Sequence, residues 1–293
     1  YPYTHGITDR WHTKKDLDPN SKTMAEILRK NGYKTAAFVG SHGNNGALGF
    51  DNGFDVYEDI KEKGFVSNVA GVVEWLGQNK DNKFFLLLQS PTSYCINMPP
   101  SPYDTIFDVG YENTNNIDFS GCYFVSPYED EPVAVVDGVK KYSLVKTDRD
   151  GWYEVTKGEE PKVLFDERDL EHLGSLHDGS IGYADSQIGE ILKSLTQLGL
   201  DDNTIIVFTS DHGKLIGDNG RFSIGAHLTG GFYDDVLHIP LVIKYPNMNA
   251  MQINGLVQII DINPTLLESL GIPNYEASQG RSLSPLIVSG IEV

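Results

Sequence analysis

Apolar positions in the first ninety residues follow helical and strand spacing in turn. A helix is predicted to begin behind the capping-box sequence Thr23-Met24-Ala25-Glu26 and to stop at Asn31-Gly32. A short buried strand follows over residues 35–39. An amphipathic helix over residues 66–76 and a strand over residues 84–88 repeat the order. This alternation predicts an α/β fold with a mainly parallel central sheet and helices on both of its faces.

The same alternation returns in the second half of the chain. A strand is predicted over residues 204–208, where no polar residue interrupts the apolar run, as is typical of the middle of a sheet. Another strand is predicted over residues 237–243 and a last helix over residues 264–270. Before them, a long helix over residues 167–198 is indicated by apolar positions at helical spacing, namely Leu170, Leu173, Ile181, Ala184, Ile188, Ile191 and Leu195.

Residues 99–165 interrupt the pattern. Pro, Asp, Asn and Tyr are frequent there, and short strands are predicted over residues 133–136, 142–145 and 152–155, with Asp-Gly turn sequences between them. We interpret residues 99–165 as an inserted lobe or excursion. Residues 1–293 then form a single core domain that carries it.

Composition excludes several classes of partner. The net charge of −18 argues against nucleic acid, whose phosphates need basic patches, and no polybasic segment suits a membrane surface. No apolar run approaches the length of a membrane span. Cys95 and Cys122 are too few for a disulfide framework or a thiolate metal site.

The strongest chemical signal is Asp211-His212-Gly213, directly after the predicted strand 204–208. Ligands of open α/β sheets bind at the carboxyl ends of strands. There the backbone can turn and let a carboxylate and an imidazole converge on one cation, such as Ca²⁺, Mn²⁺ or Zn²⁺. The alternative is a simple turn, in which Asp211 bonds nearby backbone N–H groups.

The wider pattern resembles the sulfatase family over nearly the whole chain, apart from the insertion. The segments that carry the resemblance, in order, are residues 1–7, 23–36, 49–55, 177–189, 209–213, 232–241, 261–267 and 279–283. The resemblance implies the alkaline-phosphatase-like α/β fold and hydrolysis of sulfate esters. It also implies a divalent cation, usually Ca²⁺, and a nucleophile that is a cysteine or serine oxidised to formylglycine.

By this resemblance, Asp211 and His212 are two of the metal ligands. The nucleophile, with its formylglycine, and the other ligands belong to a segment before Tyr1, because neither Cys95 nor Cys122 lies in a Cys-x-Pro-x-Arg sequence. We therefore expect the 293-residue chain itself to have little or no activity on aryl sulfates. The implied partner is a small-molecule or carbohydrate sulfate ester.

Three further residues are candidates by resemblance. His42 and His227 are predicted to contact the sulfate or the leaving group. Tyr94 stands where the family has a histidine and is predicted to line the cleft, where its phenol could bond a sulfate oxygen. The other histidines are expected to be structural or solvated, namely His5, His12, His172, His177 and His238.

Two alternatives stay open. One is a phosphodiesterase or phosphoglycerol-type transferase of the same superfamily, which would use Mn²⁺ or Zn²⁺. The other is a catalytically inactive binding homologue. Replacement of the family's usual lysine by Gly40, of an acid by Thr92 and of a histidine by Tyr94 favours this second alternative.

Overall fold

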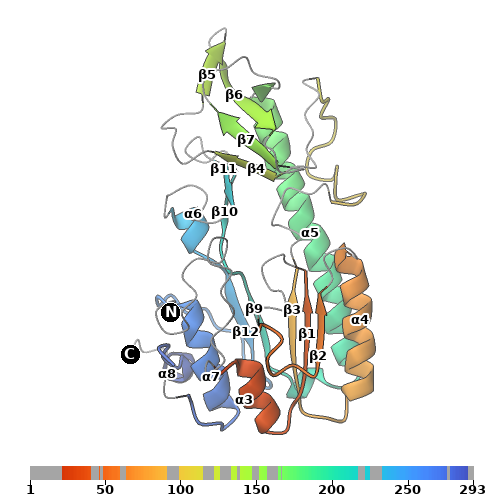
Figure 1. Ribbon diagram of the computed structural model, residues 1–293, viewed down its shortest axis with the longest axis vertical. Coiled ribbons are helices and arrows are strands. Elements are labelled where there is room, and N and C mark those ends of the chain that lie inside the picture. The colour runs from red at the N-terminus through yellow and green to blue at the C-terminus, as the bar shows by residue number, and fades with distance from the viewer. Residues whose placement is uncertain are drawn as a thin grey trace. The chain divides into compact units, whose positions relative to one another are not determined.

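The computed structural model describes residues 22–40, 46, 49–59, 64–90, 99–114, 122–125, 133–136, 139–146, 152–156, 164–165, 167–216, 222–224, 233–275 and 278–289, whose elements are labelled in Figure 1. The chain divides into two compact units. The first comprises Tyr1–Gln89, Leu195–Thr204 and Tyr245–Val293, and the second comprises Ser90–Ser194 and Ile205–Lys244. Within the described part, no helix has both the length and the apolar character needed to span a bilayer.

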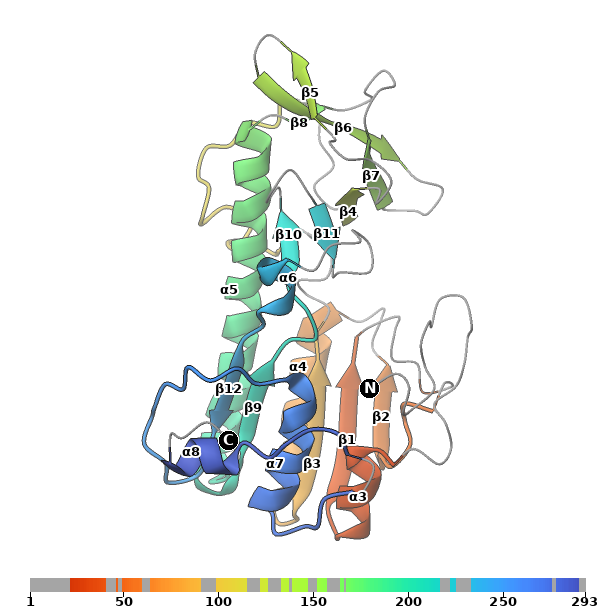
Figure 2. The same cartoon turned by 90° about the vertical axis from the view of Figure 1, so that its left-hand side faces the viewer.

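The first unit is built on three parallel strands (Figure 2). β1 (Lys34–Val39) is the middle strand, with β2 (Val56–Asp59) on one side and β3 (Phe84–Gln89) on the other. All β1 residues after Lys34 are buried. The predicted parallel sheet is confirmed. β2 was not predicted, because two of its four residues are charged and exposed.

The helices of this unit begin where the sequence indicates. In α3 (Met24–Lys30), the Glu26 N–H donates to Thr23 Oγ1 at 3.0 Å and the Thr23 N–H donates to Glu26 Oε2 at 2.9 Å, so the capping box is confirmed. Gly32 follows the helix with a φ of 84°. The unit also holds α4 (Gly64–Asn79), α7 (Ile262–Ser269) and α8 (Ser284–Ser289). Its apolar cluster is formed by Leu28, Leu267 and Ile272.

Residues 49–55 contact both α3 and β1. The Asp55 carboxylate accepts the Thr35 N–H at 3.1 Å and pairs with Arg29 Nε at 3.0 Å. A Cβ atom on Gly53 would lie 2.2 Å from the Glu26 nitrogen, and the φ of Gly53 is 91°, so only glycine fits there. This loop, which contributes to the resemblance, therefore has a structural role.

The C-terminal part of the first unit is held by Asp261. Its carboxylate accepts the Gln258 N–H and the Arg281 N–H, each at 2.8 Å. Thr265 Oγ1 donates to the Asp261 carbonyl at 2.5 Å and accepts the Leu283 N–H at 2.8 Å. The matching motifs at residues 261–267 and 279–283 thus contact each other.

The second unit contains most of α5 (Glu167–Gln197) and the strand that precedes Asp211. That strand, β9 (Ile206–Thr209), pairs antiparallel with β12 (Leu241–Lys244), with Phe208 opposite Val242 (Figure 2). We expected a central parallel strand before Asp211. Among the described residues this strand pairs only antiparallel, so the expected direction is wrong. An apolar run indicates burial and says nothing of the direction of the partner strand. The strand expected over 237–243 begins later, because α6 (Asp234–Leu237) is a helical turn.

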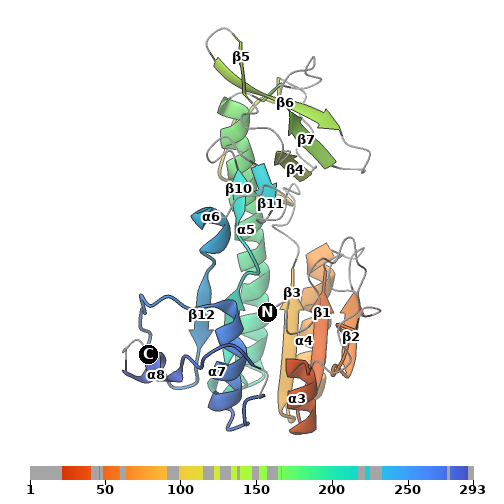
Figure 3. The ribbon, with the colours of Figure 1, turned by 60° about the vertical axis from the view of Figure 1, so that its left-hand side comes forward.

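The inserted region forms a five-stranded sheet within the second unit (Figure 3). Its path is β4 (Cys122–Val125), β7 (Trp152–Thr156), β6 (Val139–Lys146) and β5 (Val133–Val136), and β8 (Leu164–Phe165) also pairs with β6. The three strands predicted there are confirmed. That the whole chain is a single core domain with an excursion over residues 99–165 stays a prediction.

Candidate functional site

Asp211 and His212 lie at the end of β9, where the chain turns into β10 (Lys214–Ile216). The Asp211 side chain is 72% exposed and the His212 side chain is 27% exposed. Asp211 Oδ1 and His212 Nε2 are 3.9 Å apart, which is too far for a hydrogen bond. The two groups therefore face each other across a gap, at a position that solvent reaches.

Local hydrogen bonds fix this turn. The His212 N–H donates to Asp211 Oδ1 at 3.1 Å, so the simple turn interpretation of Asp211 is correct for one of its oxygens. Ser210 Oγ donates to the His212 carbonyl at 2.6 Å. His212 Nδ1 lies 2.9 Å from the Gly213 carbonyl oxygen. Both candidate ligands are thus oriented by the backbone of the turn itself.

Gly213 allows the turn to lie directly against α6. Its N–H donates to the Val236 carbonyl at 2.8 Å. A Cβ atom at this position would lie 1.9 Å from the Asp235 carbonyl oxygen, well inside any contact distance. Any residue other than glycine would therefore push the turn away from α6.

The Asp211–His212 pair fits a divalent cation as two of its ligands. Zn²⁺ binds carboxylate oxygen at about 2.0–2.2 Å and imidazole nitrogen at about 2.0–2.1 Å, and Ca²⁺ binds oxygen at about 2.3–2.6 Å, so one ion can bridge donors about 4 Å apart. Among the described residues, no group of three or more His, Cys, Asp or Glu side chains is placed to hold a metal ion. If the pair holds an ion, the described residues would thus offer two of the four or more ligands that these ions take.

The remaining predicted site residues lie outside the described residues. These are His42, Tyr94 and His227. Their proximity to Asp211 stays a prediction. Gly40, where the family has a lysine, is described and lies buried directly after β1.

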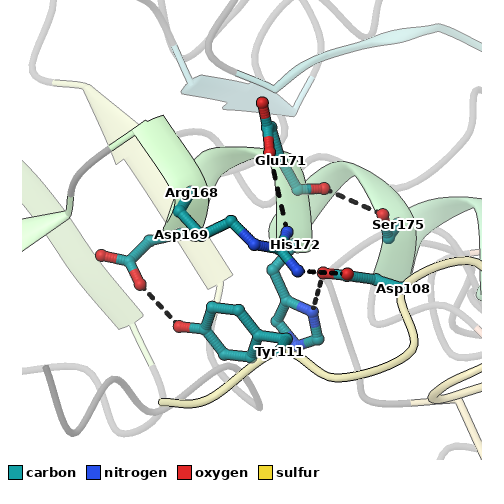
Figure 4. A network of polar contacts seen from close by, with 7 residues as sticks. All are labelled: Asp108, Tyr111, Arg168, Asp169, Glu171, His172 and Ser175. Carbon is teal, nitrogen blue, oxygen red and sulfur yellow. Dashed lines mark hydrogen bonds and ion pairs between the residues drawn. The ribbon is translucent and has the colours of Figure 1, made fainter. Parts of the chain in front are cut away.

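A second Asp–His pair, which the sequence did not indicate, joins α5 to the segment of residues 99–114 (Figure 4). Asp108 Oδ2 lies 2.8 Å from His172 Nδ1, and Asp108 Oδ1 accepts a hydrogen bond from Arg168. The Tyr111 ring stacks on His172 with centroids 3.7 Å apart, and its hydroxyl donates to Asp169 Oδ1 at 2.6 Å. We call these five residues the α5 clasp.

Polar side chains of the α5 clasp contact one another. The Arg168 guanidinium above all, and the His172 ring after it, lower the pKa of Asp108 against the effect of burial. The side chains of Asp108 and His172 are only 11% and 10% exposed. His172 was expected to be structural or solvated, and its low exposure and its contact with Asp108 favour the structural alternative.

Lys214, directly after the Asp211–Gly213 turn, was also missed. Burial lowers its pKa to about 7. Burial and the nearby Lys214 charge lower the pKa of His177, an effect that Asp178 opposes. Among the described atoms, His177 Nδ1 is buried without a hydrogen-bond partner. A lysine directly after the Asp211-His212-Gly213 turn is expected to be solvated, so nothing in the sequence indicated that the fold partly buries it.

Comparisons with known proteins identify the family to which this chain belongs. The Sulfatase family model matches residues 1–272. Arylsulfatase K of Bos taurus is 28% identical over 314 residues, which cover 97% of this chain and 54% of that protein. This chain thus spans about half the length of its curated relatives.

Solved structures show the same fold. The phosphonate monoester hydrolase of Agrobacterium radiobacter superposes with a TM-score of 0.69 at 20% identity, over 100% of this chain and 66% of that chain. A protein solved in complex with its substrate D-glucosamine-2-N,6-O-disulfate superposes with a TM-score of 0.58 at 17% identity. The superposition covers 99% of this chain and 68% of that chain. The predicted alkaline-phosphatase-like fold is confirmed, and members of this family generally bind a divalent cation. The match of the family model over residues 1–272 shows that the chain belongs to the sulfatase family.

Proposed function

We propose that this chain is the core of a sulfate-ester hydrolase in which Asp211 and His212 hold a divalent cation. The observation that carries the proposal is the pair itself, with its exposed carboxylate and its imidazole 3.9 Å apart at the end of β9. The relationship to arylsulfatase K supports sulfate as the group removed.

The proposed roles of the residues follow from their chemistry. When bound, the cation supplies positive charge that neutralises an ester oxygen and lowers the pKa of the nucleophilic hydroxyl. His42 and His227 contact the sulfate or donate a proton to the leaving alcohol. Tyr94 donates a hydrogen bond to a sulfate oxygen but brings no positive charge. Anion binding therefore depends more on the cation and on His42 than it does in relatives with a histidine at this position.

We propose Ca²⁺ as the ion and a sulfated carbohydrate as the substrate class. The carboxylate of Asp211 suits Ca²⁺, whereas an imidazole ligand also suits Mn²⁺ and Zn²⁺. The structural neighbour solved with a disulfated glucosamine supports a sugar sulfate.

Calorimetric titration of the chain with Ca²⁺, Mn²⁺ and Zn²⁺ tests the cation site. His212→Gln is expected to weaken binding of the preferred ion at least tenfold, because it removes an imidazole ligand. His238→Gln is the matched control, since His238 is an exposed histidine at the end of α6. Equal affinity of His212→Gln and the control would refute the site.

Ligand binding tests the sulfate assignment. With the preferred ion present, an aryl sulfate is expected to bind more tightly than the matching aryl phosphate, and removal of the ion is expected to abolish that binding. Preference for the phosphate would favour the phosphoryl-transfer alternative. Binding of the sulfate ester without turnover, in a protein with the nucleophile segment, would favour the inactive homologue.

A further inference from the structure

The orientation of His212 is set by a chain of contacts that starts in α6. α6 is closed by the Val236 and Leu237 N–H groups, which donate to the Tyr233 carbonyl at 2.9 and 3.0 Å. The Val236 side chain is 2% exposed, so this helical turn is anchored. Its Val236 carbonyl accepts the Gly213 N–H at 2.8 Å.

Gly213, held by α6, contacts the His212 ring through its carbonyl group. Its carbonyl oxygen lies 2.9 Å from His212 Nδ1. A carbonyl only accepts hydrogen bonds, so Nδ1 must carry the proton. A neutral imidazole with its proton on Nδ1 has its lone pair on Nε2, the atom that faces Asp211 across 3.9 Å.

We infer that Gly213 is a positioning residue that, held by α6, fixes His212 as the Nδ1–H tautomer and makes Nε2 its metal-binding atom. The inference rests on the proposed cation site. Metal-binding histidines commonly donate their second ring N–H to a carbonyl or carboxylate, and loss of that partner typically costs 10- to 100-fold in metal affinity. Here the partner is the carbonyl of the next residue, Gly213, so the His212 ring and the group that orients it belong to the same turn.

The tautomer can be measured without any cation. In the metal-free chain labelled with ¹⁵N at histidine, near pH 8, long-range proton–nitrogen NMR distinguishes a protonated Nδ1 from a protonated Nε2, and His212→Gln assigns the signal. We expect His212 to be the Nδ1–H tautomer. A protonated Nε2 in the wild-type chain would overturn the inference, whatever the cation affinity.

Gly213→Ala tests the source of the constraint. Its Cβ would collide with the Asp235 carbonyl, so the variant is expected to lose the single tautomer and 10- to 100-fold in cation affinity. Gly189→Ala in α5 is the matched control, because a Cβ there meets nothing within 4 Å. A folded Gly213→Ala chain with the wild-type tautomer would also overturn the inference.

Different results would refute the proposed cation site and the positioning of His212 by Gly213. An Nδ1–H tautomer in a chain that binds none of the three cations would support the positioning of His212 and refute the proposed cation site. A protonated Nε2 in a chain whose cation binding is lost in His212→Gln would refute the positioning and support the cation site. The wild-type spectrum decides the inference even if Gly213→Ala does not fold.

Discussion

Asp108 and His172 are 11% and 10% exposed, and their side chains contact each other at 2.8 Å. Asp211 and His212 are 72% and 27% exposed, and their side-chain atoms stay 3.9 Å apart. Both pairs belong to the second unit and combine the same two chemical groups. In the first pair, the carboxylate bonds protein donors. In the second, the gap between the groups has the width that a cation bridges.

The difference follows from how each pair is assembled. Asp211 and His212 are adjacent in sequence, and backbone bonds at a strand end orient them without joining their side chains. Asp108 and His172 are 64 residues apart, and their contact joins a loop to α5 (Figure 4). A pair such as Asp108 and His172 stabilises the fold, whereas a pair such as Asp211 and His212 stays accessible to a ligand. Four predictions test this distinction.

The largest effect is expected from Asp211→Asn. It removes the charged ligand but keeps an oxygen that can accept the His212 N–H, so cation affinity should fall on the order of 100-fold, about 3 kcal/mol. Without cation, the free energy of unfolding should change by less than about 0.5 kcal/mol, because the side chain is exposed. Calorimetry and urea denaturation measure the two quantities. Asp202→Asn, an exposed carboxylate in a short helical turn, is the control.

Asp108→Ala should show the opposite pattern. It leaves the His172 ring and the Arg168 guanidinium without their shared acceptor, so the free energy of unfolding should fall by about 2 kcal/mol. Cation affinity should not change. Asp185 is an exposed carboxylate in α5, and Asp185→Ala should change the free energy of unfolding by less than about 0.5 kcal/mol. A loss of cation affinity in Asp108→Ala would break the distinction between the pairs.

Acid should remove the Asp108 contribution. Its pKa is lowered in the folded chain, chiefly by Arg168 and then by His172, against the effect of burial. A lowered folded-state pKa stabilises the fold above the unfolded-state pKa, near 3.8, and that stabilisation is lost as the pH falls through the folded-state value. The difference in unfolding free energy between wild type and Asp108→Ala should thus be constant above about pH 5 and shrink toward pH 2. A difference that does not depend on pH would contradict the charge-based account.

Sequence reasoning succeeded where the signal is local. Each successful prediction rests on residues close together in the chain. These are the capping box of Thr23 and Glu26, the buried strand β1 and the apolar stripe of α5. The Asp211–His212 pair could be proposed as a cation site for the same reason, since the strand, the acid, the histidine and the glycine are contiguous; that it binds a cation stays a prediction.

What the sequence missed depends on distant partners. No spacing rule connects Asp108 with His172, and nothing in the apolar run of β9 shows that β12 would pair with it antiparallel. Lys214 follows the Asp211-His212-Gly213 turn, and its partial burial comes from its surroundings in the fold. Local pattern therefore predicts elements and candidate ligands, whereas the contacts that fix their surroundings require the tertiary structure.

The smallest effect is expected from Tyr111→Phe, which separates the two contributions of this ring to the α5 clasp. The variant keeps the stack on His172 and removes the hydroxyl that donates to Asp169, a residue that is only 2% exposed. A lost hydrogen bond to a buried carboxylate should cost about 1–2 kcal/mol of unfolding free energy. Tyr183→Phe in α5 is the control, because among the described residues its ring packs against Tyr103 and no hydrogen bond of its hydroxyl is found; it should stay within about 0.5 kcal/mol of wild type. Equal stability of the two variants would mean that the hydroxyl contributes nothing measurable, and that the stack of Tyr111 on His172 and the Asp108 contacts hold residues 99–114 on α5.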